Sequence, residues 1–554
     1  MTLAAEPTPR AWQAADPDAA TSDELAALIA NDPTEVTRRF AHPLTFGTAG
    51  LRGPMGAGPS HMNRLVVRRT AAATGRVLLA TNTAGPVIIG FDARHNSRTF
   101  ALDSARVLAA LGIEVQLFAD PVPTPVVAFA IGHLGAAAAI VVTASHNPAT
   151  DNGYKLYWSD GAQINAPVDS QIAAEIHRRP LIADDELAPA DDPLIRTVEP
   201  ALTDAYVASV VGLLRPGSPR HLSFVYTPMH GVGGAVLHTA FARAGFAAPV
   251  DVDAQSTPDP AFPTAPFPNP EEPGALDLAI ETADAFDLDL ILANDPDADR
   301  LAVAVRDEAR KWQQLPGDHV GCLLAEYLLS QPPSENANDR LVTTTVVSST
   351  LLGRIAQSHG AHYARTLTGF KWIVRPALDN PTRRPVLSYE EALGYAFGAA
   401  RDKDGISAAL VFAEMTAAAH ATGRTVLDLM TDLDNQHGPH RTGQRSIRWS
   451  SAAAADAMTA ALDRLRAAPP AALDGHNVTG VVDFASGHDG LAPTNLLEFQ
   501  FESGHVVIRP SGTEPKLKIY AELVGAPGAD IASLTTALGT LLDAVEAAVG
   551  TSGS

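Results

Sequence analysis

The chain has 554 residues, of which 46% are hydrophobic and 18% charged, and its formal net charge is −22. That length is several times the usual domain size, so we expect three to five domains around separate cores. The acidic balance argues against duplex nucleic acid or an anionic membrane as the main partner. No apolar stretch approaches the roughly 18 residues that a membrane helix requires, so no membrane partner is expected.

Two further features bear on the compartment. Residues Met1 to Pro17 contain acidic residues and prolines where a signal peptide has a basic start and an apolar centre. The single cysteine, Cys322, lies in an apolar, helical-looking segment, which excludes a disulfide or a cysteine metal site within one chain and predicts a buried thiol. We therefore expect a soluble, cytoplasmic protein, and no feature of the sequence specifies an oligomeric state.

Strand-like and helix-like segments alternate along most of the chain. The first domain has strand-like runs at Val87–Phe91, Val115–Phe118 and Ala136–Val142. A helical segment at Thr99–Leu111 lies between the first two runs. The alternation recurs in residues 222–244, 288–294 and 341–347. This order is typical of repeated α/β units, so we expect similar α/β domains in series.

The pattern changes from Ser446 onward. A long alanine-rich helix is followed by strand-like runs at Leu496–Phe501 and Val506–Ile508 and by a final helix at Ala532–Val549. These elements predict a smaller α+β domain at the C-terminal end.

Ser145 is the first candidate catalytic residue. It lies in the segment VVTASHNP (141–148), where an apolar run ends in a polar turn that contains proline. Such a turn places the hydroxyl in a loop at a strand end. Taken alone, the serine is equally typical of an ordinary turn.

A candidate metal site follows another strand-like run, in the segment DPDADR (295–300). If the backbone is extended there, Asp295, Asp297 and Asp299 all point to one side, and three hard oxygen donors suit Mg²⁺. An EF-hand begins in the same way, but its sixth and twelfth positions are Arg300 and Arg306 here, so that interpretation fails. The alternative to a magnesium site is an ordinary acidic turn after the strand.

A candidate phosphate cradle lies near the C-terminal end, in the segment RPSGTEPK (509–516). Arginine binds phosphate through two N–H donors, and a Ser-Gly-Thr turn presents backbone amides to an anion. The alternative is a hairpin turn with solvated charges. The order of residues is not that of a nucleotide P-loop, and the glycines of HGVGG (230–234) do not complete a dinucleotide fingerprint.

Taken in chain order, these segments resemble the α-D-phosphohexomutase superfamily of phosphoglucomutases and phosphomannomutases, especially the branch with phosphopentomutases and glucose-1,6-bisphosphate synthase. The resemblance spans roughly Leu44 to Tyr520. It rests on segments in the family's order: FGTAGLRG (46–53), TASHNP (143–148), YTPMHGVG (226–233), FPNPEE (267–272), DPDADR (295–300), TLTGFKW (366–372), EEALGY (390–395) and RPSGT (509–513).

The resemblance implies four domains around a central cleft, three related α/β domains and a smaller α+β domain, each supplying one loop. The expected ranges are 1–205 with the phosphoserine loop, 206–312 with the metal loop, 313–435 with the sugar-recognition loop and 436–554 with the phosphate-binding loop.

The resemblance also implies roles for individual residues. Ser145 is expected to carry the phosphate and, with Asp295, Asp297 and Asp299, to bind Mg²⁺. Lys155 is expected to be the general acid or base, with a pKa depressed by adjacent cations, and His146 is a second candidate. Arg52 is expected to hold the reacting phosphate. The substrate-binding residues are expected to be Thr368, Gly369, Lys371, Glu391, Arg509, Ser511, Gly512 and Thr513.

The implied function is a phosphosugar mutase that interconverts hexose 1-phosphate and hexose 6-phosphate, of glucose or mannose, through a sugar 1,6-bisphosphate. A phosphopentomutase or a glucose-1,6-bisphosphate synthase stays open, because Leu393 and Tyr395 stand where many members have serine and histidine. A Mg²⁺-dependent sugar phosphatase is a more distant alternative, as is a non-catalytic phosphosugar sensor. A second phosphate anchor favours a mutase over a phosphatase, since a mutase must bind two interchangeable ends.

Overall fold

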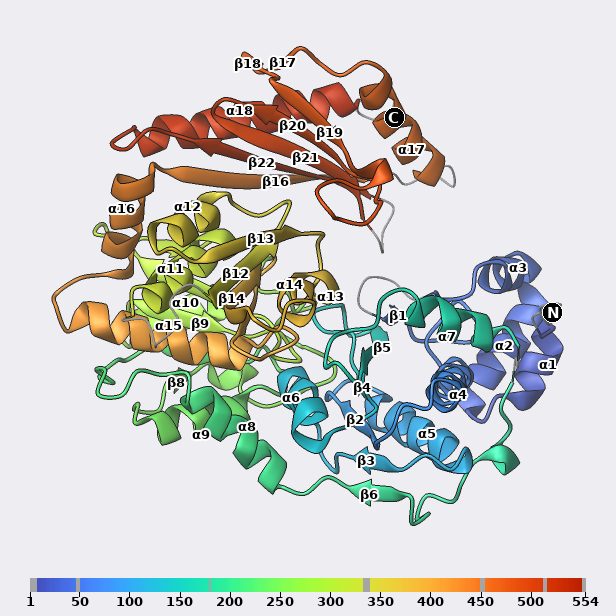
Figure 1. The fold of residues 1–554 in the computed structure, drawn as a ribbon. Helices are drawn as coiled ribbons and strands as arrows, with labels where there is room; N and C mark the ends of the chain where they lie inside the picture. The colour runs from blue at the N-terminus through green and yellow to red at the C-terminus, as the bar shows by residue number, and fades with distance from the viewer. Residues whose placement is uncertain are drawn as a thin grey trace. The chain divides into compact units, whose positions relative to one another are not determined.

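The computed structural model describes residues 7–45, 50–178, 181–331, 339–448, 454–511 and 516–550. The chain forms two compact units. Unit 1 comprises Met1–Leu315 and Gly394–Ala418, and unit 2 comprises Pro316–Leu393 and Ala419–Ser554. The ribbon and its element labels are shown in Figure 1.

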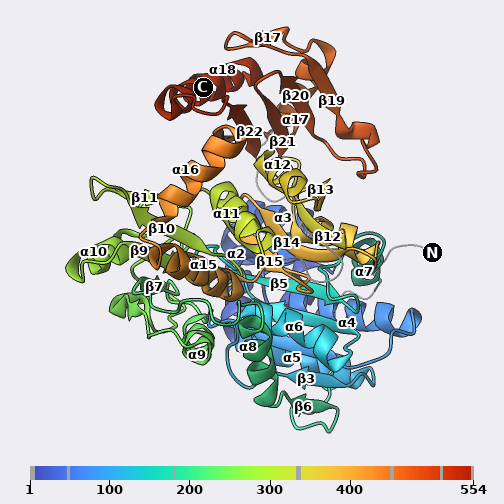
Figure 2. The same ribbon diagram turned by 60° about the vertical axis from the view of Figure 1, so that its left-hand side comes forward.

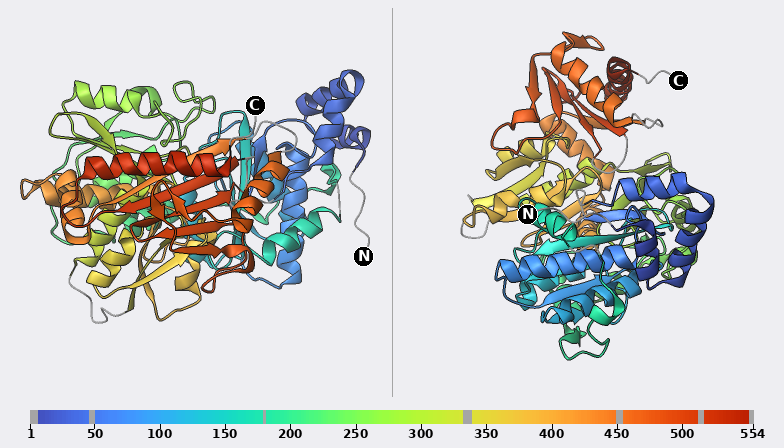
Figure 3. Two further views of the ribbon diagram at one scale, coloured as in Figure 1. Left: turned by 90° about the horizontal axis from the view of Figure 1, so that it is seen from above. Right: turned by 90° about the vertical axis from the view of Figure 1, so that its right-hand side faces the viewer.

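Unit 1 begins with three short helices that complete the core of the first domain. They are α1 (Pro9–Ala15), α2 (Ala19–Asn31) and α3 (Pro33–Ala41). A side-chain oxygen precedes each helix and accepts a backbone N–H of its first turn, which satisfies donors that have no partner inside the helix. Trp12 and Leu25 are fully buried in the same core as α4 (Arg64–Ala80), and Figure 3 shows the three helices beside α4.

The first sheet of unit 1 has six strands in the order β1-β5-β4-β2-β3-β6. Strands β2, β3, β4 and β6 are parallel, whereas β1 and β5 run antiparallel to their neighbours. Every residue of β2 and β4 is buried, as expected for central parallel strands covered by helices. The elements are β1 (Leu51–Pro54), β2 (Val87–Phe91), α5 (Ser97–Ala110), β3 (Val115–Leu117), α6 (Thr124–Leu134), β4 (Ala138–Val142), β5 (Asp151–Trp158), α7 (Val168–Ile176) and β6 (Ile195–Thr197).

The second sheet of unit 1 has five strands in the order β11-β10-β9-β7-β8. Its central strand β9 ends immediately before the aspartate triplet, which places that segment at a strand end. The elements are α8 (Ala201–Val211), β7 (Val225–Thr227), α9 (Gly234–Ala244), β8 (Val250–Asp251), α10 (Asp277–Ala285), β9 (Leu290–Ala293), β10 (Ala302–Arg306) and β11 (Trp312–Gln314); β15 (Gly394–Phe397) and most of α15 (Gly405–His420) also belong to this unit.

Unit 2 contains a parallel sheet in which β12 lies between β13 and β14. Helices α11 and α12 lie against these strands, as Figure 2 shows. Cys322 of α11 is fully buried, as the sequence predicts. The elements are α11 (Gly317–Leu329), β12 (Arg340–Thr345), α12 (Leu351–Ser358), β13 (His362–Thr366), α13 (Phe370–Ile373), α14 (Arg375–Leu378) and β14 (Arg384–Glu390).

The last sheet of unit 2 has the order β16-β22-β21-β20-β19 and is antiparallel, so the predicted change to an α+β domain is confirmed. Its elements are α16 (Val426–His437), β16 (His440–Arg448), α17 (Ala454–Ala467), β17 (Ala472–Leu473), β18 (His476–Asn477), β19 (Gly480–Asp483), β20 (Leu497–Phe501), β21 (Gly504–Pro510), β22 (Lys516–Val524) and α18 (Ile531–Val549).

Helix α18 corrects one expectation from the sequence. Within the described part of the chain it is the one helix long and apolar enough to cross a membrane by length and composition, although no such stretch was expected. Its apolar residues, among them Leu541 and Val545, join the same buried core as the strands of the last sheet. One face of helix α18 therefore packs on the core of this domain, although only 22% of its apolar window is buried (Figure 1).

Candidate active site

Ser145 lies in a tight turn just after β4. Its backbone has a φ of 54°, a left-handed conformation that residues other than glycine seldom adopt. The hydroxyl oxygen of Thr143 accepts the Ser145 N–H at 2.8 Å and supports the turn. The Ser145 side chain is 1% exposed, and its hydroxyl donates to Asp295 Oδ2 at 2.8 Å. The predicted carrier and the predicted metal loop are therefore in direct contact.

The aspartate triplet forms a turn, not the extended segment that the sequence argument assumed. Residues 296–298 are in turn or bend conformation, and Ala298 has a φ of 58°. The turn still gathers the three side chains, since one oxygen of each of Asp295, Asp297 and Asp299 lies within 4.8 Å of the others. All three side chains are fully buried. Their proximity therefore comes from a turn and not from the two-residue period of a strand.

Lys155 neutralises part of this negative charge. It lies on β5 opposite Val141, and its Nζ donates to Asp297 Oδ2 at 2.6 Å and to Asp299 Oδ2 at 2.5 Å. Burial lowers the pKa of Lys155, but the two carboxylates outweigh burial, and the net shift of the pKa is upward. The expected depression of this pKa by adjacent cations is therefore not seen, because the nearest charges are anions.

The triplet has the oxygen donors that a magnesium ion requires. Burial raises the pKa of Asp295, and the neighbouring carboxylates add to the shift. Burial also disfavours the charged form of Asp297 and Asp299, but contact with Lys155 outweighs it, so the pKa of each is lowered. Asp297 Oδ1 and Asp299 Oδ1 are buried and have no hydrogen-bond partner among the described residues, which leaves anionic oxygens suited to a hard cation.

His146 contacts the serine, and Arg52 interacts electrostatically with His146. His146 Nδ1 lies 3.2 Å from Ser145 Oγ. Burial lowers the pKa of His146 well below its usual value, and the charges of Arg300 and Arg52 lower it further, so the imidazole is neutral at pH 7. Arg52 lies on β1, and its Nε is buried with no hydrogen-bond partner in the part of the chain that the structure describes. The roles predicted for both residues stay predictions.

Two cationic residues of this site were not identified from the sequence. Lys403 is 8% exposed, and its Nζ lies 3.4 Å from Asp299 Oδ2 and 3.3 Å from Asp402 Oδ1. Arg94 is 4% exposed and donates to the backbone of the Ser145 turn. Both lie in charged segments, RDKD (401–404) and DARH (92–95), that have no diagnostic spacing relative to Ser145.

In unit 2, Glu391 has a distinct electrostatic environment. Its Oε2 accepts hydrogen bonds from Thr345 at 3.4 Å and Ser348 at 3.3 Å. Burial raises the pKa of Glu391, while the positive charges of Lys518 and Arg509 oppose the shift. Glu391 and Arg509, which were both predicted to bind the substrate, are thus close enough to interact electrostatically.

Arg509 is held at the end of β21. Its Nη2 donates to the hydroxyl of Tyr520 at 3.1 Å, and its guanidinium carbon lies 5.6 Å from the centre of the Tyr520 ring. Among the described residues, its Nε is buried without a hydrogen-bond partner. Ser511 donates its backbone N–H to Lys516 at 2.8 Å. The predicted residues Gly512 and Thr513 lie outside the described residues.

The segment that contains Thr368, Gly369 and Lys371 leads into α13. Gly369 has a φ of 101°, which explains the glycine at this turn. Lys371 Nζ lies 5.8 Å from the ring centre of Trp372, which packs against the buried cluster that includes Tyr520. Tyr520 also contacts Arg509, so unit 2 brings two of its three predicted binding segments to one cluster.

The positions that depart from the family's sugar-binding pattern are buried. Leu393 is 2% exposed and Tyr395 is fully buried. Leu393 has a φ of 61°, so its backbone adopts a left-handed turn directly after Glu391. Glu391 is therefore the residue of the segment 391–395 that combines partial exposure with a hydrogen-bonding side chain.

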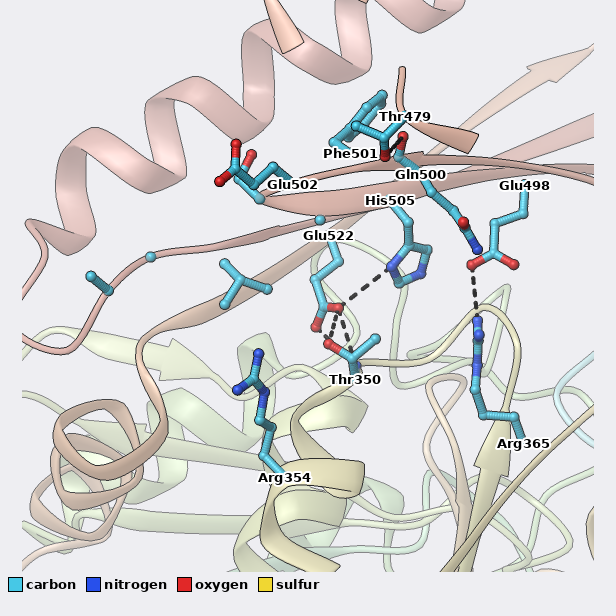
Figure 4. A pocket seen from close by; sticks show the side chains of 15 residues that line it. Thr350, Arg354, Arg365, Thr479, Glu498, Gln500, Phe501, Glu502, His505 and Glu522 are labelled. Atoms are coloured by element: carbon cyan, nitrogen blue, oxygen red, sulfur yellow. Dashed lines mark hydrogen bonds and ion pairs between the residues drawn. The ribbon is translucent and has the colours of Figure 1, made fainter. Parts of the chain in front are cut away.

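Unit 2 also contains a polar cavity of about 770 Å³, drawn in Figure 4. In its wall Glu522 accepts hydrogen bonds from the backbone N–H and hydroxyl of Thr350, at the start of α12. Arg365 donates to Glu498 at 3.2 Å on the other side. The predicted residues Arg509, Glu391 and Lys371 do not line this cavity, so it is distinct from the predicted substrate site.

Comparison with protein families gives a match over each quarter of the chain. The matches are to phosphoglucomutase/phosphomannomutase α/β/α domain I over residues 43–181, domain II over 204–308, domain III over 316–435 and the C-terminal domain over 453–530. The order and number of domains agree with the four-domain architecture expected from the sequence, with three α/β domains and a smaller C-terminal one.

Similar proteins match over nearly the whole chain. A probable phosphoribomutase of Schizosaccharomyces pombe is 36% identical, and the match covers 92% of each chain. A probable phosphomannomutase of Haemophilus influenzae is 38% identical over 84% of this chain and 93% of its own, and the human phosphopentomutase is 34% identical over 97% and 94%. The crystal structure of a putative phosphomannomutase from Thermus thermophilus has the same fold, with a TM-score of 0.69 at 24% identity over 91% of this chain and 98% of its own. The chain therefore belongs to the phosphoglucomutase/phosphomannomutase family of the α-D-phosphohexomutase superfamily.

Proposed function

We propose that this enzyme is a phosphosugar mutase that carries the transferred phosphate on Ser145. The observation that carries the proposal is the 2.8 Å contact between Ser145 Oγ and Asp295, inside a buried cluster with two further carboxylates. An ordinary turn serine does not require three buried carboxylates beside its hydroxyl. A phosphoryl carrier does, because a bound cation must neutralise the phosphate oxygens.

Asp295, Asp297 and Asp299, with an oxygen on Ser145, would hold Mg²⁺. When bound, the ion would neutralise charge that develops on the transferred phosphoryl group. Arg52 is close enough to His146 and Lys155 to act on their charge, and Lys155 holds two of the carboxylates in place. The neutral His146 imidazole, 3.2 Å from Ser145 Oγ, is placed to accept or return a proton at that oxygen.

The transfer proceeds in two halves. A sugar hydroxyl attacks the phosphorus on Ser145, the bond to Ser145 Oγ breaks, and the hydroxyl proton passes to a base. The resulting sugar bisphosphate turns around, and Ser145 Oγ then takes the other phosphate while a proton returns to the sugar oxygen. The end that is not reacting needs its own anchor, for which we propose Arg509, Ser511, Gly512 and Thr513.

We propose that pentose 1-phosphate and pentose 5-phosphate are the preferred pair, with hexose 1-phosphate and hexose 6-phosphate as weaker substrates. Burial of Leu393 and Tyr395 leaves Glu391 with fewer neighbours to bind sugar hydroxyls. Phosphoribomutases and phosphopentomutases are prominent among the similar proteins. A relative named glucose 1,6-bisphosphate synthase is 32% identical, which supports a sugar bisphosphate as the activator or intermediate.

The test measures product formation from ribose 1-phosphate and from glucose 1-phosphate, each with Mg²⁺ and a trace of glucose 1,6-bisphosphate. We expect 5-phosphate and 6-phosphate products respectively, little free phosphate, and a higher kcat/KM for ribose 1-phosphate. Mass analysis should place one phosphate on Ser145. Free phosphate as the main product would favour the phosphatase, and net accumulation of bisphosphate would favour the synthase.

A further inference from the structure

Arg94 makes an unusual set of contacts with the turn that carries Ser145. Its Nη2 donates to the carbonyl oxygens of Ser145 at 2.6 Å and Asn147 at 2.5 Å. Its Nη1 donates to Pro148 O at 2.7 Å and to Asp151 O at 3.2 Å. One guanidinium thus binds four carbonyl oxygens between residues 145 and 151.

Arg94 is itself fixed in place from three sides. Its Nε lies 3.2 Å from Asp92 Oδ2, and its guanidinium carbon lies 4.8 Å from the centre of the buried Phe262 ring. Asp92 Oδ1 accepts the Arg94 backbone N–H at 3.0 Å and the Ser97 hydroxyl at 2.6 Å. Since Arg94 is 4% exposed, its contacts are not exchanged for water.

Four carbonyl oxygens of the turn share one guanidinium; the contact with Ser145 O is buried, and the other three are partly buried. Buried carbonyls without donors are costly, and Ser145 also adopts the left-handed φ of 54°. A planar guanidinium presents five N–H groups in a fixed fork, whereas a lysine ammonium has three donors on a flexible stem. A lysine at position 94 therefore cannot reproduce two pairs of hydrogen bonds.

We propose that Arg94 is a positioning residue for phosphoryl transfer: it holds the Ser145 turn so that the hydroxyl faces Asp295. This inference rests on the proposed role of Ser145 as the phosphate carrier. Arg94 acts through the backbone of the turn and lies behind it, so its loss lowers the rate of transfer and leaves sugar phosphate binding unchanged. Displacement of a reacting group by about 1 Å can slow a reaction on the order of 100-fold.

The test compares Arg94→Lys with Arg340→Lys. Arg340 is a matched control because it is 6% exposed and also donates to two backbone carbonyls, Leu329 O at 2.8 Å and His359 O at 2.7 Å. We expect Arg94→Lys to lower kcat and the single-turnover rate of Ser145 phosphorylation by about 10- to 100-fold, with KM within about twofold of wild type. Arg340→Lys should keep the wild-type kcat.

Each outcome decides the proposal. An equal effect of the two substitutions on kcat, or a raised KM with normal kcat in Arg94→Lys, would overturn it. If Arg94→Lys does not fold, the kcat of Asp92→Asn is measured instead. This substitution keeps the shape of the side chain at position 92 and removes the ion pair that orients Arg94. A lowered kcat supports the proposal and an unchanged kcat overturns it. Wild-type protein without phosphate on Ser145 after exposure to sugar bisphosphate would instead refute the proposed function.

Discussion

Replacement of Lys155 by methionine tests whether the aspartate cluster is built for a cation. Lys155 is fully buried and holds two of three carboxylates within 2.6 Å. Methionine keeps most of the apolar stem and removes the charge. Breaking a buried ion pair by removing one partner costs about 3–5 kcal/mol, since the other charge stays buried and uncompensated. At about 2–4 °C per kcal/mol, the melting temperature in chelator should fall by on the order of 10 °C.

Magnesium should reverse much of this loss. A ligand that binds only the folded state at 100 times its Kd stabilises that state by about 2.7 kcal/mol. We therefore expect Mg²⁺ to raise the melting temperature of Lys155→Met by more than that of wild type, because Mg²⁺ restores positive charge that the variant lacks. The assay is thermal unfolding of wild type and Lys155→Met with chelator and with saturating Mg²⁺.

Lys311→Met is the control, since Lys311 is an exposed lysine of the same unit and its loss should change stability by less than about 0.5 kcal/mol. Two results would refute the reasoning. If Lys155→Met in chelator is as stable as Lys311→Met, the ion pairs do not stabilise the cluster. If Mg²⁺ does not stabilise either wild type or Lys155→Met, the triplet is not a magnesium site.

Three further predictions follow from the described geometry. Ser145→Ala should abolish mutase activity and keep the melting temperature near that of wild type, because it removes the carrier and little core volume; activity within tenfold of wild type would contradict the mechanism. Arg509→Ala should raise KM for a sugar phosphate about 10- to 100-fold, since a charge-assisted hydrogen bond contributes about 1.5–3 kcal/mol, and should leave Ser145 able to accept phosphate from a small donor. Burial raises the pKa of Asp318 from 3.8 to about 6. Between these pH values the folded state therefore binds more protons than the unfolded state. As pH rises through this window, Asp318 lowers the free energy of unfolding by up to about 3 kcal/mol. Asp318→Asn should flatten the dependence of unfolding free energy on pH between about 4 and 6, and an unchanged slope would contradict the assignment.

The sequence predicted those features of the fold that depend on local periodicity. The run Ala136–Val142 became β4 (Ala138–Val142), and the expected helix at Ala532–Val549 became α18 (Ile531–Val549). Apolar runs of these lengths are unfavourable in water unless they are buried in a strand or a helix. The boundaries of these two elements therefore follow from where the apolar residues begin and end. The expectation that no apolar stretch reaches the length of a membrane helix was wrong at α18, whose buried residues pack against the last sheet.

The candidate site was predicted by residue type and not by conformation. Asp295, Asp297 and Asp299 are close together as expected, but through a left-handed turn at Ala298 and not through an extended strand. The resemblance supplied Lys155, yet its pKa direction depends on which charges lie nearest. That information exists only after β5 pairs with β4 and faces the aspartate loop.

Arg94 and Lys403 show why sequence reasoning missed part of the site. Arg94 precedes Ser145 by 51 positions, and Lys403 follows Asp299 by about a hundred, so neither forms a local motif with its partner. In the sequence each is one of 40 lysines and arginines. Burial distinguishes them, because a charged side chain that is less than a tenth exposed must be bound to something, and in both cases the partner belongs to the serine or aspartate loop.

The buried lysines also explain how the fold can form around three buried carboxylates, whose removal from water disfavours folding. Three carboxylates without partners would each cost several kcal/mol to remove from water. Lys155 and Lys403 offset much of that cost within the chain, so the loop can form before any cation binds. Within the described ranges of the chain, Asp297 Oδ1 and Asp299 Oδ1 nevertheless have no hydrogen bonds, and this residual cost is a reason for a cation to bind there. The same arrangement that weakens the folded state would thus strengthen its affinity for Mg²⁺, because binding relieves the uncompensated charge.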